Sequence, residues 1–135
     1  MESAQLNRFI QRALALIAIA FGVLTLFAGT RVLSGVDPGY VVFKPLLIYN
    51  VAMGFVYIVA GVLAWRWLAA GRLLAGIIFA LNAVVLAAIV YLYQSGAAVA
   101  SQSVGAMSLR TVVWLMLFVG LTWLGYRYRT AGRAG

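Results

Sequence analysis

The fold is decided by an apolar stretch near the start of the chain, residues 13–33, which reads ALALIAIAFGVLTLFAGTRVL. A helix needs about 20 apolar residues to cross the roughly 30 Å hydrocarbon core of a bilayer. This stretch has 21 residues, and only Thr25, Thr30 and Arg31 among them are polar. It is too long for the apolar part of a cleaved signal peptide and lacks a clear cleavage site. We therefore interpret it as a membrane-spanning helix.

Three further apolar stretches follow, separated by short polar or basic segments. We predict four spans, over residues 13–33, 45–65, 73–93 and 104–126. Short connections favour antiparallel packing of helices that are consecutive in the sequence. The sequence thus predicts an all-α integral membrane protein, in which residues 1–135 form a single up-down bundle of four transmembrane helices.

The composition agrees with a chain that faces lipid. Of its 135 residues 66% are apolar, compared with about 45–50% in an average soluble domain. Only ten basic and two acidic residues are present, too few for the charged surface that keeps a soluble domain dispersed. The net charge of +8 does not indicate nucleic-acid binding, because such binding needs the basic residues on one accessible face.

The basic residues also predict an orientation. Seven of the ten lie at the two ends of the chain or between the second and third spans: Arg8, Arg12, Arg66, Arg72, Arg127, Arg129 and Arg133. Basic residues in short loops are retained on the cytoplasmic side of a membrane. We therefore expect both termini to be cytoplasmic, in a multi-pass protein of the cell membrane, specifically a bacterial inner membrane.

The residue types that are missing narrow the chemistry. The chain contains no cysteine and no histidine, and its only acids are Glu2 and Asp37. Thiol nucleophiles, zinc sites and paired-carboxylate catalysis all need residues of these kinds. We therefore expect no catalytic residue, no metal site, no cofactor and no enzymatic activity.

Small residues recur on one stripe of each of the first three spans. Helices in lipid pack through such residues because they let the two backbones approach closely. The glycines for which we predict this packing role are Gly22, Gly29, Gly54, Gly61 and Gly76. A stripe of this kind also fits a ligand cavity or a partner helix, but structural packing is the interpretation we favour.

Two asparagines, Asn50 and Asn82, lie deep within the second and third spans. An amide in hydrocarbon needs hydrogen-bond partners, and intramembrane polar residues are candidates for functional sites. The alternative that we favour is a hydrogen bond to a neighbouring helix.

Arg110 is the most informative charge, because it lies inside the fourth span. It must extend its guanidinium to water, pair with Asp37, or bind an anion such as a lipid head group. Ser103, Ser108 and Thr111 supply further hydrogen-bond donors nearby. We favour the two structural alternatives over lipid binding.

Lys44 and Arg31 are the other basic residues predicted on the same side as Arg110. The three together are our candidates for lipid or anion contact.

These observations predict a non-enzymatic membrane protein. The leading hypothesis is an accessory or scaffolding subunit that packs against partner helices or lipids in a larger membrane complex. The partners expected are membrane lipids, including anionic ones, and other membrane subunits or further copies of the chain. One alternative is a small oligomeric transporter or channel. Another is a carrier of an apolar ligand such as a quinone or lipid, held by aromatic residues such as Tyr57, Trp114 and Phe118.

Overall fold

The structure, a computed structural model, describes residues 3–134 and is all-helical over that range. Its four α-helices are α1 (Ser3–Leu33), α2 (Lys44–Arg66), α3 (Leu68–Gln94) and α4 (Ser101–Ala134). Each of them contains a segment long and apolar enough to cross a membrane. The four predicted apolar helices are therefore confirmed as elements of the fold.

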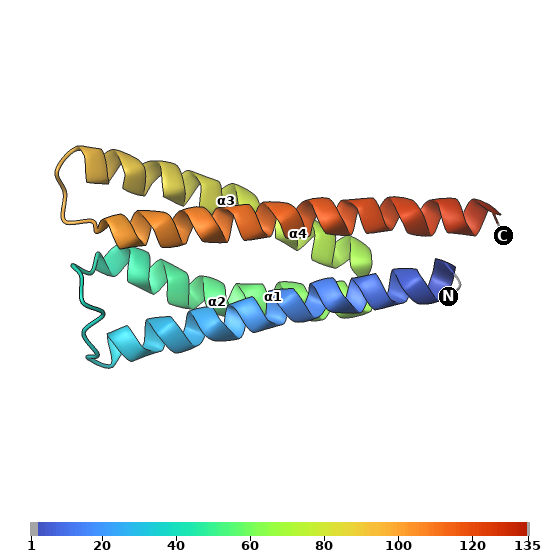
Figure 1. The fold of residues 1–135 in the computed structure, drawn as a ribbon, viewed down its shortest axis with the longest axis horizontal. Helices are drawn as coiled ribbons and strands as arrows, with labels where there is room; N and C mark the ends of the chain where they lie inside the picture. The colour runs from blue at the N-terminus through green and yellow to red at the C-terminus, as the bar shows by residue number, and fades with distance from the viewer. Residues whose placement is uncertain (1–2, 135) are drawn as a thin grey trace.

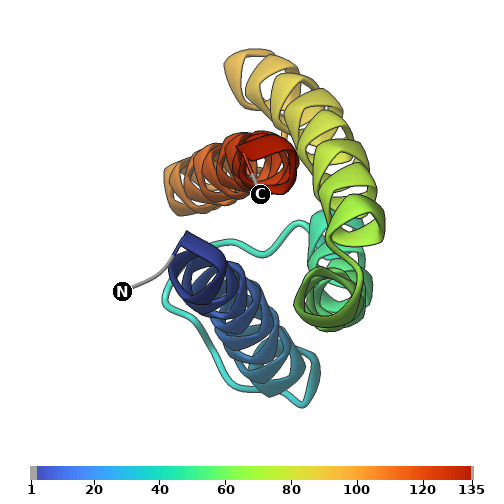
Figure 2. The same ribbon diagram turned by 90° about the vertical axis from the view of Figure 1, so that its right-hand side faces the viewer.

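The helices form an elongated bundle in which consecutive helices run in opposite directions (Figure 1). The contacts between helices close a ring in the order α1, α2, α3, α4, and the most extensive contact is that between α1 and α2. Figure 2 shows this arrangement along the axis of the bundle. Both chain ends lie at one end of the bundle, here called the terminal end, and the α1–α2 and α3–α4 connections lie at the opposite loop end.

Glycine ends two of the helices. At the end of α1, the N–H of Gly35 donates to the carbonyl of Val32 and that of Val36 to the carbonyl of Arg31, both at 3.1 Å. This pair of bonds is the Schellman motif, which needs a left-handed residue at its centre. Gly35 supplies it with φ +108°, and Gly96 does the same at the end of α3 with φ +85°.

The helices extend beyond the predicted spans, most clearly at the terminal end. Residues 66–72 were expected to form a connecting loop, but α2 and α3 are separated by Trp67 alone. Gly71 makes this sharp connection possible, because a Cβ atom there would overlap the backbone of Ala64. The fourth helix likewise begins at Ser101 and not near residue 104. The length of an apolar stretch matches the thickness of the hydrocarbon core, whereas the helix that contains it continues into water wherever its residues permit.

The α1–α2 interface is built on glycine. A Cβ atom at Gly61 would lie 2.9 Å from the carbonyl oxygen of Ala15, and one at Gly22 would lie 2.8 Å from that of Gly54. Gly29 faces Val51 in the same interface. In the α3–α4 pair, a Cβ at Gly76 would lie 2.9 Å from the Phe118 ring. Gly22 and Gly61 therefore lie where the backbones of two helices approach too closely for a side chain, whereas Gly29 and Gly76 lie against a side chain of the neighbouring helix.

A polar cluster holds the terminal end together. The Gln11 side chain on α1 donates to the carbonyl of Ala64 on α2 at 2.7 Å and accepts from the Tyr128 hydroxyl on α4 at 2.7 Å. Arg127 on α4 donates to the buried side chain of Asn7 at 2.8 Å. The carbonyls at the end of a helix have no partner within that helix, so Gln11 satisfies one of them while linking three helices.

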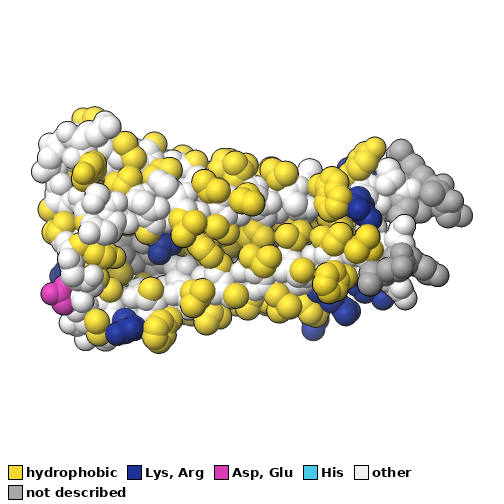
Figure 3. All heavy atoms as spheres, viewed as in Figure 1, with side chains coloured by type: hydrophobic (Ala, Val, Ile, Leu, Met, Phe, Trp, Pro, Cys, Tyr) yellow, Lys and Arg dark blue, Asp and Glu magenta, His cyan; other side chains and the backbone are white. Residues whose placement is uncertain are grey.

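The surface of the bundle is largely apolar. Large hydrophobic side chains are exposed along all four helices, among them Leu24, Phe55, Val84 and Met116. Figure 3 shows apolar side chains along the length of this face, with basic side chains gathered toward the terminal end. A continuous apolar surface of this extent is typical of a protein surrounded by lipid.

Candidate functional site

The candidate site is formed around Arg110, at the loop end of the bundle. Arg110 lies nine residues after Ser101, where α4 begins, which corresponds to about 14 Å along the helix axis. Because α4 starts earlier than predicted, Arg110 lies deeper below the loop end than the sequence indicated. The residue is half-buried.

A cavity of about 80 Å³ adjoins Arg110, bounded by α1, α2, α4 and the α1–α2 connection. Its polar or ionisable lining residues are Thr25, Tyr40, Asn50, Ser103 and Arg110, and the rest of its wall is apolar or glycine. A smaller cavity of about 50 Å³ shares Tyr40, Asn50 and Ser103 with it. Figure 3 shows a recess at the loop end, with a basic side chain inside it. Helices α1 and α4 both line this site, and the contact between these two helices is the least extensive one in the ring.

The polar side chains of the cavity differ in whether they have hydrogen-bond partners. The Thr25 hydroxyl donates to the carbonyl of Phe21 at 2.8 Å. The Oδ1 atom of Asn50, in contrast, is buried and has no hydrogen-bond partner among the described residues. Rotation of the amide exchanges its oxygen and nitrogen, so Asn50 offers either an acceptor or a donor to a bound group.

Arg110 has no carboxylate partner in the part of the chain that the structure describes. Tyr40 lines the same cavity as Arg110. Asp37, considered in the sequence analysis as its partner, is exposed and accepts a hydrogen bond from the backbone N–H of Gly39 at 2.9 Å. The structure therefore does not form the Asp37–Arg110 pair, because the turn at Pro38 uses the carboxylate locally.

The other two basic candidates lie apart from this cavity. Arg31 is exposed, with its guanidinium 5.4 Å from the centroid of the Phe27 ring. Lys44 is also exposed and lines a different groove, of about 440 Å³, beside the α1–α2 connection. Of the three basic residues singled out from the sequence, Arg110 alone lines the cavity between the helices.

The two asparagines have different environments. Asn82 is fully buried and accepts from the Tyr49 hydroxyl at 2.8 Å, while its Nδ2 donates to the Tyr57 hydroxyl at 3.0 Å. Asn82 therefore links α3 to α2, which is the structural arrangement favoured from the sequence. Asn50, the residue that follows Tyr49 on α2, lines the Arg110 cavity instead.

Several features of the site were not predicted. Tyr40 and Thr25 enter the cavity wall from the α1–α2 connection and from α1, and no spacing in the sequence relates them to Arg110. Ser108 and Thr111 were considered as extra donors, but both hydroxyls donate to carbonyls four residues earlier in α4. Only Ser103 of that group lines the cavity.

The aromatic residues considered for an apolar ligand have another role. Tyr57 and Trp114 are buried in the core with ring centroids 4.8 Å apart, and Phe21 packs on Tyr57 at 5.7 Å. Aromatic pairs in this range stabilise a core through their contact. Phe118 packs against the same core and also lines a hollow between α3 and α4.

No protein-family model, no curated protein and no solved structure matches this chain.

Proposed function

We propose that this chain is a non-enzymatic, multi-pass protein of the cell membrane that binds the anionic head group of a lipid through Arg110. The observation that carries the proposal is a half-buried arginine without a carboxylate partner in the described residues, beside a cavity that also contains the unpartnered Oδ1 of Asn50. We place the terminal end at the cytoplasmic face, from the distribution of basic residues.

Electrostatics favours an anion in this position. A charge held between helices is costly unless it is paired, because the surroundings have a low dielectric constant. A phosphate or carboxylate next to Arg110 offsets this cost, and guanidinium groups bind both with paired hydrogen bonds. The Ser103 hydroxyl lines the same cavity and can donate to such a group, and Asn50 can do so when its amide is turned so that the nitrogen, and not Oδ1, faces the cavity.

The size of the cavity determines how much of a lipid it accepts. A volume of about 80 Å³ is well below the roughly 300–1,000 Å³ of pockets that enclose a drug-sized ligand. This space suits a phosphate or carboxylate but not a whole lipid or a quinone ring. The acyl chains would remain outside the bundle. They would pass out of the cavity between α1 and α4, the two neighbouring helices with the least extensive contact.

A role as an accessory or scaffolding subunit of a larger complex is our second proposal. It is supported by Gly105 on the exposed side of α4, where an added Cβ atom would meet no atom within 4 Å. An exposed helical glycine lets a partner helix approach closely.

The lipid proposal is tested by native mass spectrometry of the gently purified protein. Arg110→Gln should lose bound anionic lipid, whereas Asp37→Asn should retain it. Arg31→Gln is the matched control, because Arg31 is an exposed arginine near the same end that does not line the cavity. Equal amounts of anionic lipid on Arg110→Gln and on the wild-type chain would refute the proposal.

A further inference from the structure

We propose a second lipid site, at the opposite end of the bundle, that holds an anionic phospholipid on the outer side of α3 and α4. Two adjoining hollows define it. The first, of about 190 Å³, is lined by Leu68, Ala69, Arg72, Gly125 and Arg129. The second, of about 490 Å³, is lined by Arg72, Leu73, Gly76, Ile77, Ala80, Phe118 and Thr122. They meet at Arg72, and together they are called here the α3–α4 groove.

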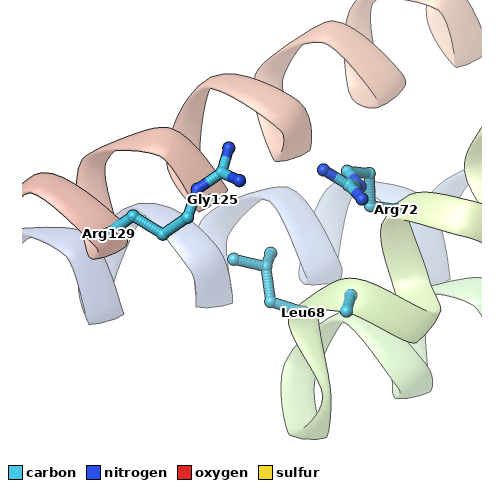
Figure 4. A pocket seen from close by; sticks show the side chains of 5 residues that line it. Leu68, Arg72, Gly125 and Arg129 are labelled. Carbon is cyan, nitrogen blue, oxygen red and sulfur yellow. The ribbon is translucent and has the colours of Figure 1, made fainter.

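The mouth of the groove carries two arginines from different helices. Figure 4 shows the guanidinium groups of Arg72 on α3 and Arg129 on α4 pointing toward one another across the first hollow. Its other lining residues are leucine, alanine and glycine, with no acid among them. Two facing cations repel each other, and a phosphate between them replaces that repulsion by two charge-assisted hydrogen-bonded contacts.

The body of the groove, which is the second hollow, is mostly apolar and covers most of one leaflet. Along α3 it extends from Arg72 to Ala80, which is about 12 Å at the helical rise per residue. Half of the hydrocarbon core of a bilayer is about 15 Å. A lipid with its phosphate between the two arginines would therefore lay an acyl chain against Leu73, Ile77 and Phe118, toward the middle of the bundle.

Thr122 provides an independent indication of a polar ligand. Its hydroxyl oxygen is buried and has no hydrogen-bond partner in the described part of the chain, although it lies in the groove wall. Thr122 precedes Arg129 by seven residues on α4, which places it about 10 Å further from the terminal end. The ester groups of a phospholipid lie below its phosphate in the same direction, so an ester carbonyl can accept from this hydroxyl once the Thr122 side chain rotates toward the groove.

The charge of the mouth and the apolar body together select the occupant. A soluble phosphate would satisfy Arg72 and Arg129 but would leave the apolar groove and Thr122 without a partner. A zwitterionic lipid would fill the groove, but its own cation would weaken the attraction to the arginines. An anionic phospholipid of the leaflet at the terminal end fits all three features, and this site is independent of the Arg110 cavity.

The test measures lipids bound to the full chain after reconstitution in nanodiscs that contain equimolar phosphatidylglycerol and phosphatidylcholine with the same acyl chains. Native mass spectrometry should show phosphatidylglycerol enriched on the wild-type protein. Arg72→Gln and Arg129→Gln should each lower this enrichment about fivefold, the effect typical of one basic residue near an anionic lipid surface. The matched control is Arg66→Gln, because Arg66 is exposed at the same end and lines neither hollow.

A second pair of variants tests the apolar part. Ala80→Phe should fill the groove and lower the binding of both lipids, whereas Leu81→Phe, at the neighbouring exposed position, should not. All measurements are repeated in an Arg110→Gln chain, so that lipid at the other end does not obscure the result. Equal enrichment in Arg72→Gln, Arg129→Gln and Arg66→Gln, or equal binding by Ala80→Phe and Leu81→Phe, would overturn the α3–α4 site while leaving the Arg110 proposal unaffected.

Discussion

Replacing Gly61 by alanine adds one methyl group at the closest approach of α1 and α2. The new Cβ atom would lie 2.5 Å from Cγ1 of Ile19, 2.9 Å from the carbonyl oxygen of Ala15 and 3.0 Å from the backbone nitrogen of Ile19. The isoleucine side chain can change its rotamer, but the two backbone atoms belong to a helix. Ordinary contact begins at 3.4 Å, so α1 must move away by about 0.5 Å.

Two opposing terms decide the size of the effect. Overpacking of this kind costs typically about 1–3 kcal/mol, and here the movement also loosens the neighbouring contact of Gly22 with Gly54. Alanine is favoured over glycine inside a helix by about 1 kcal/mol. We therefore expect Gly61→Ala to lower the free energy of unfolding by up to about 2 kcal/mol. Gly61→Leu and Gly22→Leu should lower it further.

Gly105 is the matched control, because it is a helical glycine whose added Cβ would meet no atom within 4 Å. Gly105→Ala should leave the free energy of unfolding unchanged or raise it by up to about 1 kcal/mol. The assay is unfolding of the purified protein from mild detergent into sodium dodecyl sulfate, followed by tryptophan fluorescence, since Trp114 is buried. The same change in both alanine variants would refute the argument that glycine sets the distance between α1 and α2.

Three further predictions follow from particular contacts. Asn82→Leu removes the hydrogen-bond partner of the Tyr49 and Tyr57 hydroxyls. It should destabilise the bundle by about 0.6 to 1.7 kcal/mol, the average and the maximum measured for such bonds in membranes. Unchanged unfolding would show that the tyrosines find other partners. Gln11→Ala breaks the hydrogen bonds to Ala64 and Tyr128 and should lower the free energy of unfolding by about 1–2 kcal/mol. Gln5→Ala, at an exposed position of the same helix, should leave it almost unchanged. Equal effects of the two variants would count against a link between helices at the terminal end. Since the chain has no cysteine, an impermeant thiol reagent added outside intact cells should label Ser101→Cys and not Ala70→Cys, and the reverse labelling would contradict cytoplasmic termini.

The sequence predicted the number and order of the helices because apolar length is a property of each segment by itself. Gly22 and Gly61 were singled out for a related reason, since stripes of small residues in an apolar span are typical of close helix packing. The ends of the helices were less predictable. Nothing in the composition of residues 66–72 distinguishes a loop from two helices separated by one residue, because the sharp connection depends on Gly71 fitting against Ala64.

The candidate site was predictable only in part. Arg110 was identified because a charge inside an apolar span needs an explanation whatever surrounds it. Its neighbours depend on tertiary contacts between α1, α2 and α4, which is why Tyr40 and Thr25 were missed and why Asp37, an acid expected on the same side, was considered as a partner. The structure shows that the Asp37 carboxylate accepts a hydrogen bond from the N–H of Gly39 within a local turn.

The most direct test of the central claim measures whether a lipid phosphate lies beside Arg110. The protein is labelled in its arginine side chains, reconstituted with phosphatidylglycerol and measured by solid-state NMR. Phosphorus should dephase the signal of the guanidinium carbon of a phosphate-bound arginine, because paired hydrogen bonds hold the two atoms about 4 Å apart. The account predicts a dephased arginine signal that is present in the wild-type protein and in Arg31→Gln and is absent in Arg110→Gln. A spectrum in which every dephased arginine signal persists in Arg110→Gln would contradict it.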